Sequence, residues 1–141
     1  KKVSSWFISE PKVSLKKIEI EKASFSKIKL KVEVLVENPN SFSLNLSSLN
    51  YNISESDKNL VTGNFKEQTE ISPRKSTKLK LPVEINIQSI IPRLMKMSLK
   101  KEKSLTINWQ ATAKFYLPLL STYQVTVPFT GASQIKNPFL S

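Results

Sequence analysis

The chain has 141 residues, a length that fits one domain, and 39% of them are hydrophobic, which is enough for a core and excludes a disordered chain. It contains no cysteine and no histidine, which excludes disulfides, thiolate catalysis and zinc–thiolate sites and removes the commonest general base. The formal net charge is +11, and all but two of the 22 basic residues are lysine, which attracts anionic surfaces but is poor at bidentate recognition.

Acidic residues offer little material for catalysis. Asp57 is the only aspartate, and most glutamates in the predicted strands are placed beside lysines. The composition therefore predicts a non-enzymatic protein with no cofactor and no metal.

Alternation of apolar and polar residues predicts the first two strands. The first run contains Val13, Leu15, Ile18 and Ile20. Its parity changes at Lys16–Lys17, which predicts a bulge. In the second run, over residues 25–37, the alternating apolar residues are Ile28, Leu30, Val32, Val34 and Val36.

The tripeptide Asn38-Pro39-Asn40 directly follows the second strand. Proline fixes φ and withdraws a backbone donor, while asparagine bonds to its own backbone and tolerates turn geometry. The motif therefore predicts a structural turn that ends the strand, and not a ligand site.

Two more strands are expected in the middle of the chain. Residues 49–53 alternate, and a polar turn over residues 55–59 joins them to Leu60 and Val61. Alternation returns over residues 79–87, with Pro82 on the outward parity. Because proline cannot donate to a ladder, this strand is predicted to lie at a sheet edge or to be bulged.

One segment has helical spacing. Ile90, Leu94 and Met97, with Ile91 alongside, predict one short helix near residues 90–99, with Ser89 as its cap and Pro92 in its first turn. Four lysines crowd its far end, where cations suit the helix dipole, and they are the predicted contacts for an anionic surface: Lys96, Lys100, Lys101 and Lys103. The other interpretation of this run is a solvated charged face.

The longest alternating run extends from Leu105 to Leu117, and a last run extends from Tyr123 to Phe129. Trp109 shares the apolar parity, so we expect it to be inward. At four positions the opposite face of the strand carries neutral polar residues instead of charges, which predicts a central or covered position; these residues are Thr106, Asn108, Gln110 and Thr112.

Short alternating strands with polar turns predict an all-β fold, a two-sheet antiparallel sandwich of the immunoglobulin/fibronectin-like kind with one short helix. We expect one domain over residues 12–136, a tether or lead-in over 1–11 and a tail over 137–141. Because the sequence begins with lysine rather than methionine, we expect a removed upstream segment and an extracytoplasmic, membrane-anchored protein. A cytoplasmic protein is the alternative.

The order of these signals resembles the water-stress and hypersensitive-response (WHy) domain of the late-embryogenesis-abundant type 2 family. The resemblance covers residues about 12–131, and its most specific element is Asn38-Pro39-Asn40 after a hydrophobic strand. It implies a two-sheet sandwich with one helix, a role in tolerance of drying or other stress, and no enzymatic activity. It does not imply the strong positive charge.

Three functions are compatible with these observations. The first is a monomeric, stress-protective binding module near an anionic membrane surface or a client protein. The second is a lipid-carrying domain, in which residues 117–120 and the helix residues Ile91, Leu94 and Met95 line an apolar opening between the sheets. The third is a nucleic-acid binder driven by charge alone, since the scarcity of arginine argues against recognition of a specific sequence.

Overall fold

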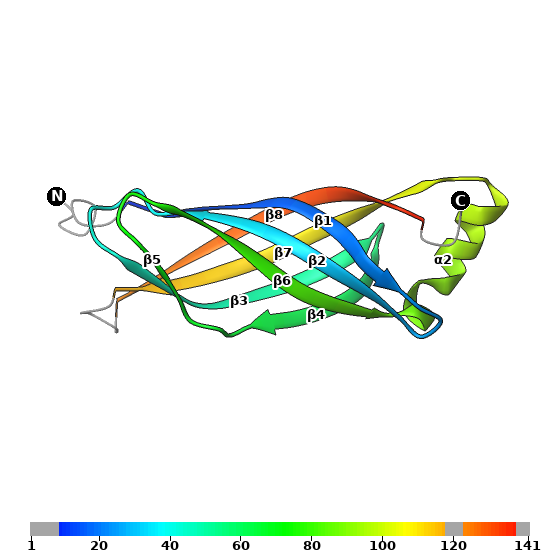
Figure 1. Ribbon diagram of the computed structural model, residues 1–141, viewed down its shortest axis with the longest axis horizontal. Helices are drawn as coiled ribbons and strands as arrows, with labels where there is room; N and C mark the ends of the chain where they lie inside the picture. The colour runs from blue at the N-terminus through cyan, green and yellow to red at the C-terminus, as the bar shows by residue number, and fades with distance from the viewer. Residues whose placement is uncertain (1–8, 118–122, 138–141) are drawn as a thin grey trace.

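The computed structural model describes residues 9–117 and 123–137, which form two antiparallel sheets with one helix across an end of the sandwich (Figure 1). The elements in chain order are β1 (Lys12–Ala23), β2 (Lys27–Glu37), β3 (Leu44–Glu55), β4 (Lys58–Phe65), β5 (Thr69–Ile71), β6 (Ser76–Asn86), α2 (Ile87–Leu99), β7 (Ser104–Tyr116) and β8 (Gln124–Lys136). No helix in these ranges is long and apolar enough to cross a membrane.

The strands divide into two sheets whose apolar faces meet. The first sheet has the order β1-β2-β6; the second has the order β4-β3-β7-β8, with the short β5 paired to β3. The predicted alternation is confirmed, because the inward residues of β2 and β7 are buried and form one core with those of β3 and β6. The all-β sandwich prediction is therefore confirmed, and β5, which carries a single buried apolar residue, was not predicted.

Strand β7 is central in its sheet, between β3 and β8, which agrees with the neutral polar residues at 106, 108, 110 and 112 on its outer face. Trp109 is fully buried, as its parity predicted. Its ring stacks on Tyr51 with ring centroids 5.0 Å apart and lies 6.2 Å from the Phe129 ring. This aromatic group fills the core near the middle of the sandwich.

Strand β1 closes one side of the sandwich. Its pairing with β2 shifts between Leu15 and Lys17, which confirms the predicted bulge, and shifts again between Ile20 and Lys22. Gly131 of β8 leaves room for this approach, since a Cβ there would lie 2.8 Å from Cβ of Leu15. The Ser133 hydroxyl then bridges the two sheets, accepting from the Ile18 N–H at 3.1 Å and donating to the Ile18 carbonyl.

Strand β6 forms the other edge of the three-stranded sheet, so the predicted edge position of Pro82 is confirmed. Its register with β2 runs without a shift through the pair Lys31 and Pro82, so the strand is not bulged there. Proline is tolerated because its missing N–H faces away from the ladder.

The helix begins earlier than the sequence suggested. Asn86, and not Ser89, is its cap, and the Asn86 side chain accepts from the Gln88 N–H at 3.0 Å. The Ile87 N–H donates to the Ser26 carbonyl in the last rung of the β2–β6 ladder, and the helix continues directly from that residue. Pro92 consequently lies in the second helical turn, where it cannot donate the usual i+4 hydrogen bond to the Gln88 carbonyl.

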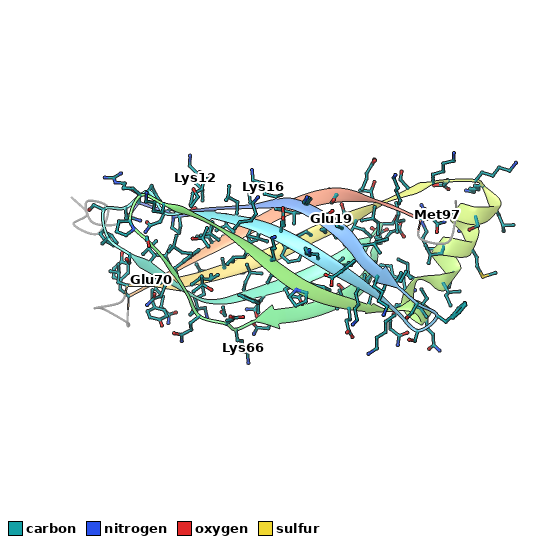
Figure 2. The ribbon with its side chains drawn as sticks, viewed as in Figure 1. Lys12, Lys16, Glu19, Lys66, Glu70 and Met97 are labelled. Atoms are coloured by element: carbon teal, nitrogen blue, oxygen red, sulfur yellow. The ribbon has the colours of Figure 1, made fainter. Side chains whose placement is uncertain are left out.

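Charged side chains cover the outer face of the three-stranded sheet. Lys12 and Lys16 on β1 project away from the sandwich, as does Lys66 beyond β4 (Figure 2). Opposite charges face each other across the strands, in the pairs Glu19 with Lys31, Lys29 with Glu84 and Glu33 with Lys80. Such cross-strand pairs stabilise the sheet and offset part of the lysine excess.

Candidate functional site

The four predicted lysines lie together at the C-terminal end of α2 and in the turn that follows it. Lys96 and Lys100 are on or beside the last helical turn, and Lys101 and Lys103 precede β7. All four are exposed, and within the described part of the chain none forms an ion pair. We call them the helix-end lysines.

A defined cap places these lysines. The Lys101 N–H donates to the Ser98 carbonyl at 3.1 Å, and the Glu102 N–H donates to the Met97 carbonyl at 2.8 Å. These two bonds are a Schellman motif, in which Lys101 occupies the left-handed position that glycine usually takes, with φ of 57°. The side chains therefore project from an ordered turn.

An acidic group limits the local positive charge. Arg93 Nε donates to Glu55 Oε2 at 2.9 Å, and Arg93 Nη2 lies 3.6 Å from Glu102 Oε2. The bond to Glu55 raises the pKa of the Arg93 guanidinium above its ordinary value. Lys96 and Lys100 line a surface depression that also contains Glu55, Asp57, Lys58, Arg93 and Glu102, so four cations face three carboxylates there. The sequence did not predict this link between α2 and the β3–β4 hairpin, whose partners are 38 residues apart.

An exposed apolar surface lies at the same end of the sandwich. The buried face of α2 carries Ile87, Ile90, Leu94 and Met97, which confirms the inward helix residues that the sequence predicted. The next face carries Ile91, Met95 and Leu99, which are 39%, 62% and 83% exposed, and we call these three the apolar stripe. Phe25, at the turn between β1 and β2, is 98% exposed and lines the same groove of about 510 Å³. The i, i+4 spacing of the apolar stripe can be read from the sequence, but the exposure of its side chains cannot.

The Asn38-Pro39-Asn40 turn is at the opposite end. Asn38 is 2% exposed, and its Nδ2 donates to the carbonyls of Phe42 at 2.8 Å and Ile71 at 3.1 Å. Its Oδ1 accepts from Asn40, both from the backbone N–H at 3.0 Å and from Nδ2 at 2.9 Å. Arg74 Nη1 donates to the Pro39 carbonyl at 2.6 Å. The polar groups of the turn are thus occupied by the chain's own atoms.

The structure separates the two segments that were predicted to line a lipid opening. Leu117 follows the end of β7 that pairs with the start of β8, whereas α2 precedes the other end of β7. Residues 118–120 lie outside the described residues. A strand of 13 residues is about 43 Å long, so Leu117 and the helix residues do not line one opening.

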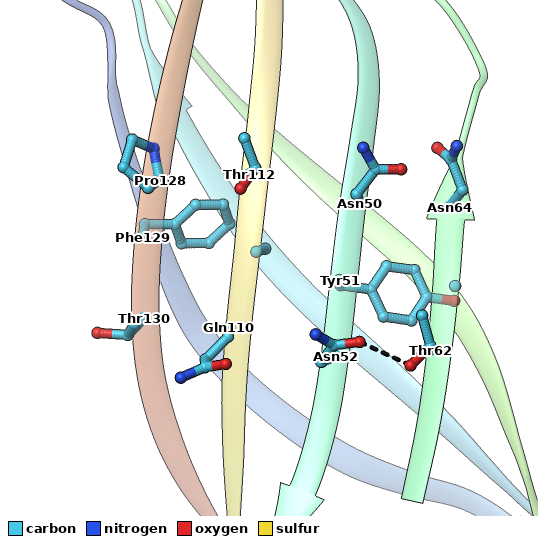
Figure 3. A pocket seen from close by; sticks show the side chains of 12 residues that line it. Asn50, Tyr51, Asn52, Thr62, Asn64, Gln110, Thr112, Pro128, Phe129 and Thr130 are labelled. Carbon is cyan, nitrogen blue, oxygen red and sulfur yellow. Dashed lines mark hydrogen bonds between the residues drawn. The ribbon is translucent and has the colours of Figure 1, made fainter. Parts of the chain in front are cut away.

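The outer face of the five-stranded sheet is polar but uncharged over its central part (Figure 3). One row across four strands is Asn64, Asn50, Thr112 and Pro128, and the next is Thr62, Asn52, Gln110 and Thr130. A shallow groove of about 770 Å³ lies over these rows. Asn52 Oδ1 accepts from the Thr62 hydroxyl at 2.6 Å, while Tyr51 and Phe129 point to the core side.

A family model described as late embryogenesis abundant protein matches residues 33–131, which include the Asn38-Pro39-Asn40 turn, α2 and the helix-end lysines. The chain belongs to this family, LEA_2. Membership supports a stress-related role. The match begins within β2, so β1 is a part of this LEA_2 sandwich that the family model does not cover.

Solved structures share the LEA_2 fold at low sequence identity. A protein of Arabidopsis thaliana, solved in solution, has a TM-score of 0.75 at 16% identity and covers 92% of this chain and 83% of its own. A late embryogenesis abundant (LEA) protein, also solved in solution, has a TM-score of 0.69 at 17% identity and covers 98% of this chain and 79% of its own. A protein from Archaeoglobus fulgidus has a TM-score of 0.62 at 14% identity and covers 94% of this chain and 99% of its own. No curated protein matches the sequence.

Proposed function

We propose that this LEA_2 protein is a non-catalytic, stress-protective module that lies against anionic membrane surfaces through its helix-end lysines. Within the family we assign it to the WHy type, because Asn38-Pro39-Asn40 follows a hydrophobic strand. The observation that carries the proposal is the gathering of four exposed lysines, without ion-pair partners in the described ranges, at one end of the sandwich. In this proposal the sandwich holds the helix-end lysines in a fixed position.

The positive charge elsewhere is partly compensated. Most outward lysines of the three-stranded sheet face a glutamate across the strands. At the end of α2, Lys96 and Lys100 share a depression with three carboxylates, whereas Lys101 and Lys103 are not among its lining residues and have only Glu102 between them. Attraction to an anionic surface is screened beyond about 8 Å at physiological salt. Contact should therefore be weak, non-specific in head group and steeply salt-dependent.

The nucleic-acid alternative has less support from the side chains. The chain has two arginines, and both are engaged within the fold, Arg74 with the Pro39 carbonyl and Arg93 with Glu55. Each guanidinium therefore already has a partner within the fold that competes with bidentate contact to a base edge or a phosphate. Lysine charge alone would support only salt-sensitive, sequence-independent binding.

Co-sedimentation with vesicles tests the proposal. Vesicles containing phosphatidylserine should retain the protein at low salt and release it near physiological salt, and pure phosphatidylcholine vesicles should not retain it. Substituting the four helix-end lysines with glutamine should lower the salt concentration at which release occurs.

A matched control removes the same charge elsewhere. Glutamine at four exposed lysines of the three-stranded sheet, Lys12, Lys29, Lys78 and Lys80, also lowers the net charge by four but should leave retention close to that of the original protein. An equal loss in both variants would show that net charge alone binds the vesicles, and the proposed contact would be wrong. Tight retention on phosphatidylcholine would show that burial of apolar side chains, and not charge, holds the protein on the vesicle, and the proposed electrostatic contact would be wrong.

A further inference from the structure

Exposed hydrophobic side chains are concentrated at the α2 end. Among the described residues, five large hydrophobic side chains are exposed, and four of them are Phe25, Ile91, Met95 and Leu99. The fifth, Tyr123, is 38% exposed and stands next to β8 at the other end. A gathering of apolar side chains on a lysine-rich surface requires a separate explanation, since single exposed hydrophobic residues are common but contiguous groups indicate a contact surface.

These side chains are not needed to attach the helix. Ile87, Ile90, Leu94 and Met97 already pack α2 against the sandwich, and the apolar stripe lies on the neighbouring face of the helix. Phe25 occupies a turn held by the Ser24 hydroxyl, which accepts from the Lys27 N–H at 3.2 Å. Turns usually contain polar residues, and the Phe25 ring contributes almost no buried area to the fold.

Lysines border this apolar surface. Lys96 and Lys100 each follow a residue of the stripe, Met95 and Leu99, so that they lie about 100° further round the helix. Lys101 continues the basic border beyond the helix, and Lys22 lies near Phe25 at the end of β1. Apolar and cationic surfaces therefore share one end of the molecule, and α2 lies across that end (Figure 1).

We infer that the α2 end is a bilayer-insertion tip, in which Phe25, Met95 and Leu99 enter the acyl boundary of an anionic membrane while the helix-end lysines contact its head groups. This inference rests on the proposed function and adds burial of apolar side chains to it. A bilayer fits both surfaces, because anionic head groups overlie an apolar layer within about 5–10 Å. Nucleic acid offers the same charge but no apolar layer accessible to these side chains. The stripe spans eight residue steps, or about 12 Å, which suits shallow insertion and not a membrane crossing.

A single fluorophore tests the insertion directly, because these 141 residues contain no cysteine. The variant M95C, labelled with an environment-sensitive fluorophore, should show a blue shift and a gain in intensity on phosphatidylserine-containing vesicles. The matched variant Q110C carries the label on the uncharged sheet face and should show neither change. An unshifted spectrum of M95C on vesicles that retain the protein would overturn the inference and leave the proposed electrostatic contact intact.

Retention gives a second measurement. The double variant M95Q/L99Q should bind phosphatidylserine-containing vesicles about tenfold more weakly, whereas M95L, which keeps the side chain apolar, should bind as the original protein does. Unchanged binding of the double variant would overturn the inference. If the lysine-to-glutamine variant and M95Q/L99Q both lose binding, the result supports both the lysine contact with head groups and the insertion of the apolar side chains.

Two further outcomes identify other occupants. A blue shift of labelled M95C that grows with protein concentration in the absence of vesicles would show that a second copy covers the stripe, and the inference would be wrong. Equal insertion into pure phosphatidylcholine would show that the lysines do not select the surface, which overturns the anionic part of the inference.

Discussion

At the end of the sandwich where β2 terminates, Asn38 and Asn40 are almost completely buried, and each bonds to atoms of the chain itself. At the α2 end, by contrast, Phe25, Met95 and Leu99 face solvent. Polar residues are thus buried at one end and apolar residues exposed at the other, the reverse of what residue type alone suggests. The polar groups of the first end are satisfied within the fold, whereas the second end leaves apolar side chains in water, which the proposed insertion into a bilayer would cover.

The buried amide end should be the more sensitive to substitution. N38A leaves the carbonyls of Phe42 and Ile71 and the Asn40 N–H without their partner, so we expect a loss of about 2–4 kcal/mol in the free energy of unfolding. Urea denaturation would measure it. The control N50A changes an exposed asparagine on the uncharged sheet face and should stay within about 0.5 kcal/mol. Similar small effects for both variants would show that the Asn38 bonds do not hold this end together.

The polar attachment of the helix should have an intermediate effect. R93A leaves the buried Glu55 carboxylate without its guanidinium, and we expect a loss of about 1–3 kcal/mol. The control K96A changes a residue of the same helix that is exposed and has no ion pair in the described ranges. It should change the free energy of unfolding by less than about 0.5 kcal/mol. If thermal unfolding showed equal losses in both variants, the Arg93–Glu55 bond would not anchor α2 to the β3–β4 hairpin.

The apolar stripe should have the smallest effect on stability. M95Q/L99Q should unfold within about 0.5 kcal/mol of the original protein, because both side chains are exposed on the outer face of α2. L94A, on the buried face of the same helix, should cost about 2–5 kcal/mol. A large loss in M95Q/L99Q would assign the stripe to the fold and would contradict the contrast between the two ends.

Regular elements were predictable because their evidence is local. The alternation that predicted an inward Trp109, the parity change at Lys16–Lys17 and the edge position of Pro82 all follow from the repeat of a strand and the missing donor of proline. The helix start was misplaced because Asn86 and Ser89 are both good caps. The bond from the Ile87 N–H to Ser26, which favours the earlier start, joins segments that are 61 residues apart.

The candidate site was predictable only in part. The four lysines were identified from their position at the end of a helical segment, but two of their acidic neighbours, Glu55 and Asp57, come from the β3–β4 hairpin, which sequence spacing does not connect to α2. Only the packed structure shows that the Phe25 ring lies beside the apolar stripe.

The sequence by itself determined the long strands, the presence of one helix and which face of each of these elements is apolar, because these properties depend on periods of two and 3.6 residues. The tertiary structure decided which apolar residues remain in water and which polar residues are buried. Asn38 is buried because Ile71, 33 residues away, supplies an acceptor, and Leu99 is exposed because nothing in the described structure covers that face of α2. Burial depends on partners that are distant along the chain, and local periodicity contains no information about them.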